Sequence, residues 1–237
     1  MPVKKYMHLD FNIKLNSQLY LRDPESTDLG KEIIASSIKL IYNLGYEQFT
    51  FKKLAAEITC TEATIYRYFE NKHKLLIYLI DCYWAFMEFQ IVFKTNNVVS
   101  PKEKINTVID LLVWEDNSEL HFSKLDQKAL YYIAIAESNK TYLSKGVDEN
   151  NKDALYQPYK DLCKRIADIF MEYKPGFTYP KSLASSLVEM SHLQYYFMQH
   201  LPRLCDFEEK KSPKEIEKFL AHFVFGTLDY GGGEKLI

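Results

Sequence analysis

The sequence predicts an all-α protein with a small N-terminal head of three helices and a larger C-terminal helical domain. Two short helices and the start of a third fit within residues 50–75. Over most of the remaining chain, apolar residues recur at helical spacing, and breakers such as Pro175 and Gly176 separate these segments. The 237 residues suffice for one large domain or two small ones. We expect an extended arm over residues 1–22, the head over 23–80 and the helical domain over 81–230.

The composition is that of a soluble globular protein, with 47% hydrophobic and 26% charged residues. A net charge of -2 excludes a polycation, so the whole chain gives no sign of binding nucleic acid. The four cysteines have no short paired spacing, which predicts free thiols in a reducing compartment; a redox-sensing role for Cys60 is the alternative. The first residues lack the apolar run of a signal peptide, so we expect a cytoplasmic protein.

The first 22 residues have a pattern of their own. Apolar side chains alternate with polar ones from Met7 to Leu15, which predicts an extended, strand-like arm. Such an arm cannot bury its apolar side alone, so we expect it to pack on the helical body or against the arm of a second subunit. An arm that enters the minor groove of DNA is the alternative, although apolar alternation suits packing better.

A first long helix is predicted over residues 23–43. Asp23 would cap it, Pro24 would occupy its first position, and Gly45 would end it. Its buried stripe is expected to comprise Ile33, Ile34, Ser37, Leu40, Ile41 and Leu44.

Residues 50–75 have the pattern of a helix-turn-helix. Thr50 can cap a helix over 51–58, and Thr61 can cap a second helix over 62–69 after a three-residue interruption. In the second helix, Ile65 and Phe69 share one face, and Ala63 and Arg67 lie opposite. This helix has only about two turns, so it must be held by packing of its apolar face against the first helix.

In a helix-turn-helix, the second helix enters the major groove of DNA. Arg67 would read a guanine edge, and threonine and tyrosine hydroxyls would contact phosphates. Asn71 can cap the next helix, whose first residues Lys72, His73 and Lys74 suit a bound phosphate better than helix stability alone. Residues 50–76 carry a local net charge of +2. The predicted DNA-contact set is Thr50, Thr61, Ala63, Thr64, Tyr66, Arg67, Tyr68 and Lys72.

This stretch resembles the DNA-binding signature of TetR-family transcriptional regulators. The resemblance rests on Thr50-x-x-x-Leu-Ala and Thr61-x-x-Thr-Ile-Tyr-x-Tyr-Phe-x-Asn-Lys-x-x-Leu75, and it covers roughly residues 28–80. It implies a homodimer that contacts itself through the last two helices and blocks transcription at a palindromic operator until a ligand releases it. Two departures are Thr59, where the family usually has glycine, and His73, where an acid is usual.

Residues 75–93 raise the possibility of a membrane span, because 16 of these 19 residues are hydrophobic. Asp81 and Glu88 lie in the middle, and a helix that is apolar all round can equally be buried in a protein core. The core helix is the favoured interpretation, running from Lys72 to about Lys94.

Further helices are predicted at about 101–116, 123–138, 155–173, 180–200 and 213–228, with no strand among them. The charged run 145–153 is expected to be a solvated loop.

Aromatic residues make up 15% of the chain, which predicts that some of them line a cavity for an apolar or aromatic ligand in addition to those in the core. The resemblance also implies a ligand pocket in this region. The candidate pocket residues are Tyr83, Trp84, Met87, Trp114, Tyr132, His192, Tyr195 and Tyr196.

No catalytic motif is evident. Glu189 and His192 form one Glu-x-x-His pair, but a di-iron bundle needs a second copy on another helix. We therefore expect no metal, no cofactor and no enzymatic activity. The alternative to a ligand-released repressor is a helical ligand-binding or interaction protein that keeps the fold without reading DNA.

Overall fold

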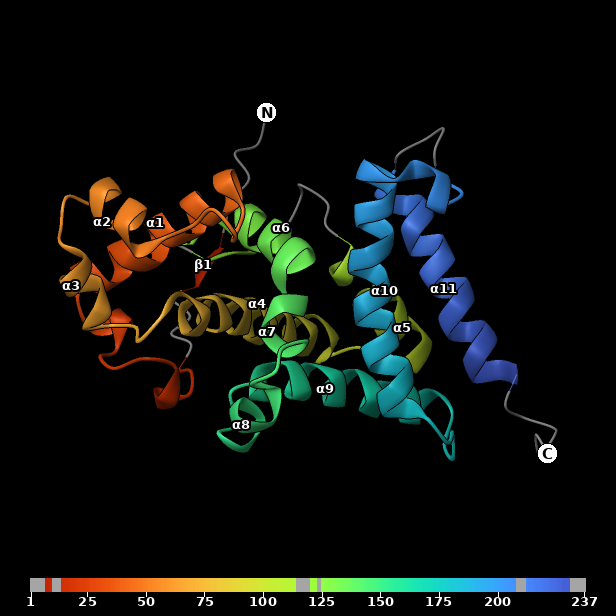
Figure 1. Ribbon diagram of the computed structural model, residues 1–237. Helices are drawn as coiled ribbons and strands as arrows, with labels where there is room; N and C mark the ends of the chain where they lie inside the picture. The colour runs from red at the N-terminus through yellow and green to blue at the C-terminus, as the bar shows by residue number, and fades with distance from the viewer. Residues whose placement is uncertain (1–6, 10–13, 114–119, 123–124, 208–211, 231–237) are drawn as a thin grey trace. The chain divides into compact units, whose positions relative to one another are not determined.

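The computed structural model describes residues 7–9, 14–113, 120–122, 125–207 and 212–230 (Figure 1). The chain divides into two compact units. Unit 1 comprises Met1–Trp84 and Asp116–Gln157, and unit 2 comprises Ala85–Glu115 and Pro158–Ile237. Both units are discontinuous in sequence, whereas the predicted domains are continuous.

The all-α prediction is confirmed, with two three-residue strands as the exception within the described residues. Unit 1 contains the head helices and two later groups of short elements. These elements are β1 (Met7–Leu9), the 3-10 helices η1 (Ser17–Leu19) and η2 (Pro24–Ser26), α1 (Asp28–Leu44), α2 (Phe51–Glu57), α3 (Glu62–Tyr66), β2 (Leu120–Phe122), α6 (Gln127–Glu137), α7 (Asn139–Tyr142) and α8 (Val147–Lys152).

The first long helix starts later than predicted. Asp23 and Pro24 do form a capped turn, but that turn is η2, and a second cap at Thr27 starts α1 at Asp28. The Thr27 hydroxyl accepts the Gly30 N–H at 3.0 Å. The helix ends as expected at Gly45, whose φ of 76° is favourable only for glycine. Its buried face includes Ile38, whereas the predicted Leu40 and Leu44 are only half-buried.

The N-terminal arm does contain a strand. β1 pairs in parallel with β2 of the same chain, so the prediction of no strand beyond the arm was wrong. Among the described residues, four other elements were not predicted: η1 in the arm, α7, η3, and α8 in the charged run predicted to be a loop. Residues 10–13 of the alternating pattern lie outside the described residues.

The long apolar helix α4 spans Lys72–Thr95, close to its predicted bounds. Its most apolar 18-residue window has a mean hydropathy of 1.5, which is high enough for a membrane span. However, 78% of that window is buried inside the protein, as in the core helix of a soluble protein. Residues up to Trp84 belong to unit 1 and those from Ala85 to unit 2.

Unit 2 packs the second half of α4 with α5 (Pro101–Leu112), α9 (Gln157–Tyr173), α10 (Pro180–His200) and α11 (Pro213–Tyr230). Helices α10 and α11 run side by side in opposite directions, joined near the 3-10 helix η3 (Pro202–Leu204) (Figure 1). Ile105, Leu187 and Leu220 are fully buried. Lys104 of α5 pairs with Glu172 of α9 at 2.5 Å.

The turn between α2 and α3 contains a strained residue. Thr59 has a φ of 54°, although it is β-branched, and it occupies the position after the helix C-cap that glycine usually takes. The Cys60 N–H reaches back to the Ala55 carbonyl at 2.9 Å, which is the Schellman bond that requires this left-handed residue.

Replacing Thr59 by glycine should therefore stabilise unit 1. The left-handed conformation costs an L-residue about 1–2 kcal/mol, part of which glycine loses again through backbone entropy, so we expect a net gain of about 1 kcal/mol. Chemical denaturation of Thr59→Gly and Thr59→Ala checks this, with alanine gaining less because it retains a Cβ. A glycine variant less stable than the parent would contradict the strain.

Candidate DNA-binding site

The helix-turn-helix has the arrangement that the sequence predicts. Thr50 caps α2 by accepting the Lys53 N–H at 3.2 Å, and Thr61 caps α3 by accepting the Thr64 N–H at 3.2 Å. Helix α3 is shorter than predicted, because its C-cap is Arg67 and the chain turns at residues 67 and 68. Ile65 is fully buried, so α3 is held by its apolar face as expected for so short a helix.

The opposite face of α3 is open to solvent. Ala63, Tyr66 and Arg67 are exposed, and Thr64 is half-buried. Tyr66 is 48% exposed, and its ring stands edge-on to Phe51 with 5.0 Å between centroids. This contact holds one edge of the tyrosine ring, while nearly half of the residue remains exposed. The face thus combines a small residue, a guanidinium and a phenol, as predicted.

The capping threonines have a second capacity. A capping hydroxyl uses its oxygen to accept a backbone N–H, and its own O–H remains a donor. Thr50 and Thr61 are both exposed. Such a donor is open to solvent at the start of α2, whereas at the start of α3 the Thr61 hydroxyl is shared with Thr64. The Thr61 and Thr64 hydroxyl oxygens lie 2.9 Å apart and hydrogen-bond to each other.

Tyr68 differs from its prediction as a phosphate contact. Its side chain is only 2% exposed, and its hydroxyl lies 2.8 Å from the Thr27 hydroxyl at the start of α1. The guanidinium carbon of Arg22 stands 5.3 Å from the ring centroid. Because ring and hydroxyl are both engaged within unit 1, Tyr68 is not part of the exposed face of α3.

Lys72 is half-buried at the start of α4, where Asn71 caps the helix by accepting the Lys74 N–H at 2.9 Å. Its ammonium donates to the Tyr46 and Phe49 carbonyls at 3.2 and 3.3 Å and lies 4.4 Å from the Tyr46 ring centroid. Lys72 therefore holds the turn before α2. An ammonium has three donors, so one stays available for a phosphate.

His73, the second departure from the family pattern, is half-buried beside Lys72. Burial, with a smaller contribution from Lys74, lowers the pKa of its imidazole below the ordinary value of 6.5. The side chain is therefore neutral at physiological pH. This removes one cation from the positive end of the α4 dipole.

A buried acid connects the head to α6. Glu137, at 8% exposure, accepts the Tyr46 N–H at 3.0 Å, and Lys140 bridges Glu137 and Glu47 at 2.8 Å each. Sequence reasoning missed this network, since a side-chain bond to a backbone group 91 positions away leaves no periodic signal.

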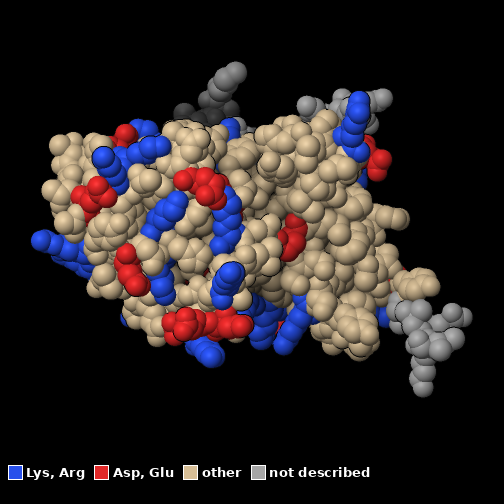
Figure 2. Space-filling view, in the orientation of Figure 1, with Lys and Arg blue, Asp and Glu red and all other residues tan. Residues whose placement is uncertain are grey.

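On the face shown in Figure 2, acidic and basic side chains are interspersed over the helices of unit 1. Two exposed acids contribute to this mixture near the head, because Glu57 pairs with Lys39 at 2.7 Å and Glu47 pairs with Lys140. The head is therefore only modestly basic, in agreement with its local net charge.

The predicted ligand residues fall in both units. Tyr83, Trp84 and Tyr132 belong to unit 1, where Tyr83 lies 4.8 Å from Trp84 and 6.4 Å from Tyr131 between ring centroids. Met87, His192, Tyr195 and Tyr196 belong to unit 2, and Trp114 lies outside the described residues. Burial lowers the pKa of His192 to about 3, so this imidazole is neutral. The pocket stays a prediction.

The family comparison agrees with this geometry. Residues 33–79 match the sequence model described as "Bacterial regulatory proteins, tetR family". The matched stretch contains most of α1, all of α2 and α3, and the first turns of α4. No curated protein matches the chain.

Solved structures with the same fold cover most of the chain. AibR in complex with isovaleryl coenzyme A and operator DNA is 16% identical, with a TM-score of 0.55, over 82% of this chain and 98% of that one. The fatty acid degradation regulator FadR from Bacillus halodurans is 16% identical (TM-score 0.54; 81% and 92% covered). A TetR transcriptional regulator from Legionella pneumophila is 21% identical (TM-score 0.53; 85% and 97% covered).

At such low identities, the solved structures show the fold alone. The family match over residues 33–79 shows that the helix-turn-helix head resembles that of TetR-family regulatory proteins in sequence. Together with the capped α2–turn–α3 arrangement, these matches show that the chain resembles TetR-family regulatory proteins in its fold and in the sequence of residues 33–79.

Proposed function

We propose that this protein is a cytoplasmic transcriptional repressor that binds a palindromic operator as a homodimer and is released by a small apolar or aromatic ligand. The observation that carries the proposal is the solvent-facing side of α3, which we call the reading face. Arg67, Tyr66 and Ala63 are exposed there, while Ile65 anchors the helix from beneath. A guanidinium on such a face suits the two acceptors of a guanine edge in the major groove.

Phosphate contacts would fix the register of α3. The proposed contacts are the exposed Thr50 and Thr61 hydroxyls, the Tyr66 phenol and the remaining N–H donor of Lys72. Such contacts position a protein on DNA without reading sequence. With only a modest positive charge on each head, two heads are needed for useful affinity, and the two half-sites would lie about 34–36 Å apart.

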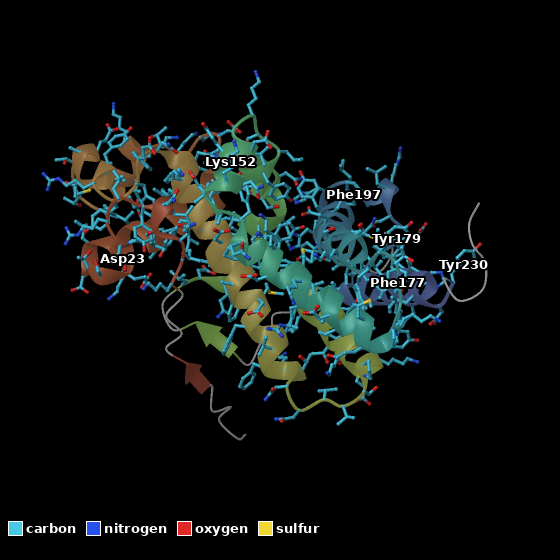
Figure 3. All side chains as sticks on the ribbon, turned by 90° about the horizontal axis from the view of Figure 1, so that it is seen from below. Asp23, Lys152, Phe177, Tyr179, Phe197 and Tyr230 are labelled. Carbon is cyan, nitrogen blue, oxygen red and sulfur yellow. The ribbon has the colours of Figure 1, made fainter. Side chains whose placement is uncertain are left out.

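The dimer would form through α10 and α11. Leu193 and Tyr196 of α10 are 49% and 38% exposed, and few charged side chains cover these two helices on the face shown in Figure 2. Tyr179 before α10 and Tyr230 at the end of α11, both labelled in Figure 3, are 66% and 79% exposed. Exposed apolar side chains on adjacent helices support a protein interface.

A ligand should raise the thermal stability of the protein. A compound present at 100 times its dissociation constant contributes about 2.7 kcal/mol to the free energy of unfolding if it binds only the folded state. Thermal shift assays with a panel of aromatic acids, medium-chain acyl esters and isovaleryl coenzyme A, the compound bound by AibR, would detect this. Absence of a shift across the apolar and aromatic members would argue against the proposed ligand class.

DNA binding is tested by fluorescence anisotropy with the DNA upstream of the protein's own gene and with a scrambled duplex. Since the contacts are largely ionic, affinity should fall steeply between about 50 and 200 mM salt. If neither duplex is preferred, selection from a random duplex library follows. Recovery of no consensus sequence would contradict the proposal and favour a ligand-binding protein that does not read DNA.

A further inference from the structure

Residues 15–27, which we call the clamp segment, hold the residue that directly follows Arg67. Three of its members contact Tyr68. The Leu21 N–H donates to the Tyr68 carbonyl at 2.8 Å, the Arg22 guanidinium lies 5.3 Å from the ring centroid, and the Thr27 hydroxyl hydrogen-bonds to the phenol at 2.8 Å. Backbone, ring and hydroxyl of one buried tyrosine are thus all engaged by one segment.

Helix α3 needs such support because it has only five residues. A helix of this length is unstable alone, so its direction depends on what holds its ends. Thr61 caps the first end of α3. The second end runs directly into Tyr68, whose N–H donates to the Ile65 carbonyl at 2.9 Å. A shift of Tyr68 would therefore move Arg67, its neighbour in sequence.

The clamp segment is itself fixed at its first end. Leu15 and Leu19 are buried, and Tyr20 stands edge-on to Tyr78 of α4 with 6.2 Å between centroids. Asn16 uses its amide oxygen to accept the Gln18 N–H and its amide nitrogen to donate to the Asp153 carbonyl at 2.7 Å.

Its second end is fixed on α1. Asp23, labelled in Figure 3, caps η2 by accepting the Glu25 N–H at 2.9 Å. Pro24 is buried against α1 at Gly30, where a Cβ would overlap the Pro24 carbonyl. The contacts to Tyr68 therefore come from a segment anchored on both sides of residues 21 and 22.

We propose that the clamp segment positions the recognition helix, so that Arg22 and Tyr68 set the sequence specificity of DNA binding without contacting a base. This inference rests on the proposed function of α3. It assigns to a segment upstream of the matched residues 33–79 a part in how Arg67 is presented.

The test compares Tyr68→Phe, Arg22→Ala and the double variant with the full-length parent. Tyr68→Phe keeps the ring and removes only the bond to Thr27. We expect the ratio of operator to scrambled-duplex affinity to fall about fivefold for Tyr68→Phe, about threefold for Arg22→Ala and about tenfold for both. The slope of log affinity against log salt should stay unchanged, because no phosphate contact is lost.

Two control variants separate the positioning of α3 from a change in charge and from a loss of overall stability. Lys14→Ala removes the same charge as Arg22→Ala from an exposed arm residue and should leave the ratio unchanged. Ile216→Val lowers stability in unit 2 and should also leave it unchanged, which separates positioning from general destabilisation. An unchanged ratio in the double variant overturns the proposal. So does a salt slope reduced by about 0.9 in Arg22→Ala alone, which would mark Arg22 as a phosphate contact.

A second measurement does not depend on DNA. In the double variant, hydrogen exchange of the backbone amides at residues 67, 68 and 69 should speed up about tenfold relative to the parent, because the second end of α3 loses its support. If the parent binds no duplex selectively, the proposed function fails while this readout still decides whether the clamp holds α3. Unchanged exchange at these amides overturns the proposal that the clamp segment holds α3.

Discussion

Replacing Arg67 by alanine should abolish most of the preference for operator over scrambled DNA while leaving the fold intact. A guanidinium paired with a guanine edge discriminates by about 1–3 kcal/mol, so the affinity ratio should fall about 5- to 150-fold for each half-site. Because Arg67 is exposed, its replacement should change the free energy of unfolding by no more than about 0.5 kcal/mol. Fluorescence anisotropy and thermal melts measure the two quantities.

Lys52→Ala is the matched control for Arg67→Ala. Lys52 is an exposed cation on α2, one helix away from the reading face. Its loss should weaken binding to both duplexes alike and leave the affinity ratio unchanged. If Lys52 neutralises a phosphate, the salt slope should also fall by about 0.9. Equal weakening of both duplexes by Arg67→Ala would mean that Arg67 contacts phosphate and that another residue reads the base.

Replacing Asp81 by asparagine should stabilise the protein increasingly as the pH rises. Asp81 lies in the first half of α4 at 2% exposure, and no donor within the described residues reaches its Oδ2 atom. Burial raises the pKa of this carboxyl well above its ordinary value of 3.8, so folding must bind a proton or bury a charge.

Proton binding determines whether the stability of the parent rises or falls with pH. Above the ordinary Asp pKa, the folded protein holds a proton that the unfolded chain releases, so the parent loses stability with rising pH. The difference between Asp81→Asn and the parent should be near zero at pH 4. It should then grow by about 1.4 kcal/mol per pH unit until the folded pKa is reached. Chemical denaturation between pH 4 and 9 measures this difference.

Two further variants separate ionisation from other effects. Asp148→Asn removes an exposed carboxylate from α8 in the same unit and should change stability by at most about 0.5 kcal/mol. Asp81→Leu, which also removes the polar group, should stabilise by about 1–3 kcal/mol even at pH 4. A pH-independent difference between Asp81→Asn and the parent would show that the carboxyl stays charged or acquires a partner.

The sequence by itself determined the parts of this protein that depend on neighbours in the chain. Thr50 and Thr61 cap helices where predicted, Gly45 ends α1, and Ile65 faces inward while Arg67 faces outward. These features follow from caps, glycine conformation and helical period, which act over one or two turns. The family resemblance rests on the same local residues, and for this reason it was visible without a structure.

Only the tertiary structure decided what depends on residues far apart in sequence. Tyr68 is buried because Thr27 and Arg22 reach it from another segment, and Thr59 stays left-handed because the turn must bring α3 against α2. Glu137 bonds to Tyr46 across 91 positions, and β1 finds its partner at β2. Each of these contacts joins two particular groups and does not recur at a regular spacing in the sequence. No pattern along the chain therefore predicts them, and they form only when the folded backbone brings those groups together.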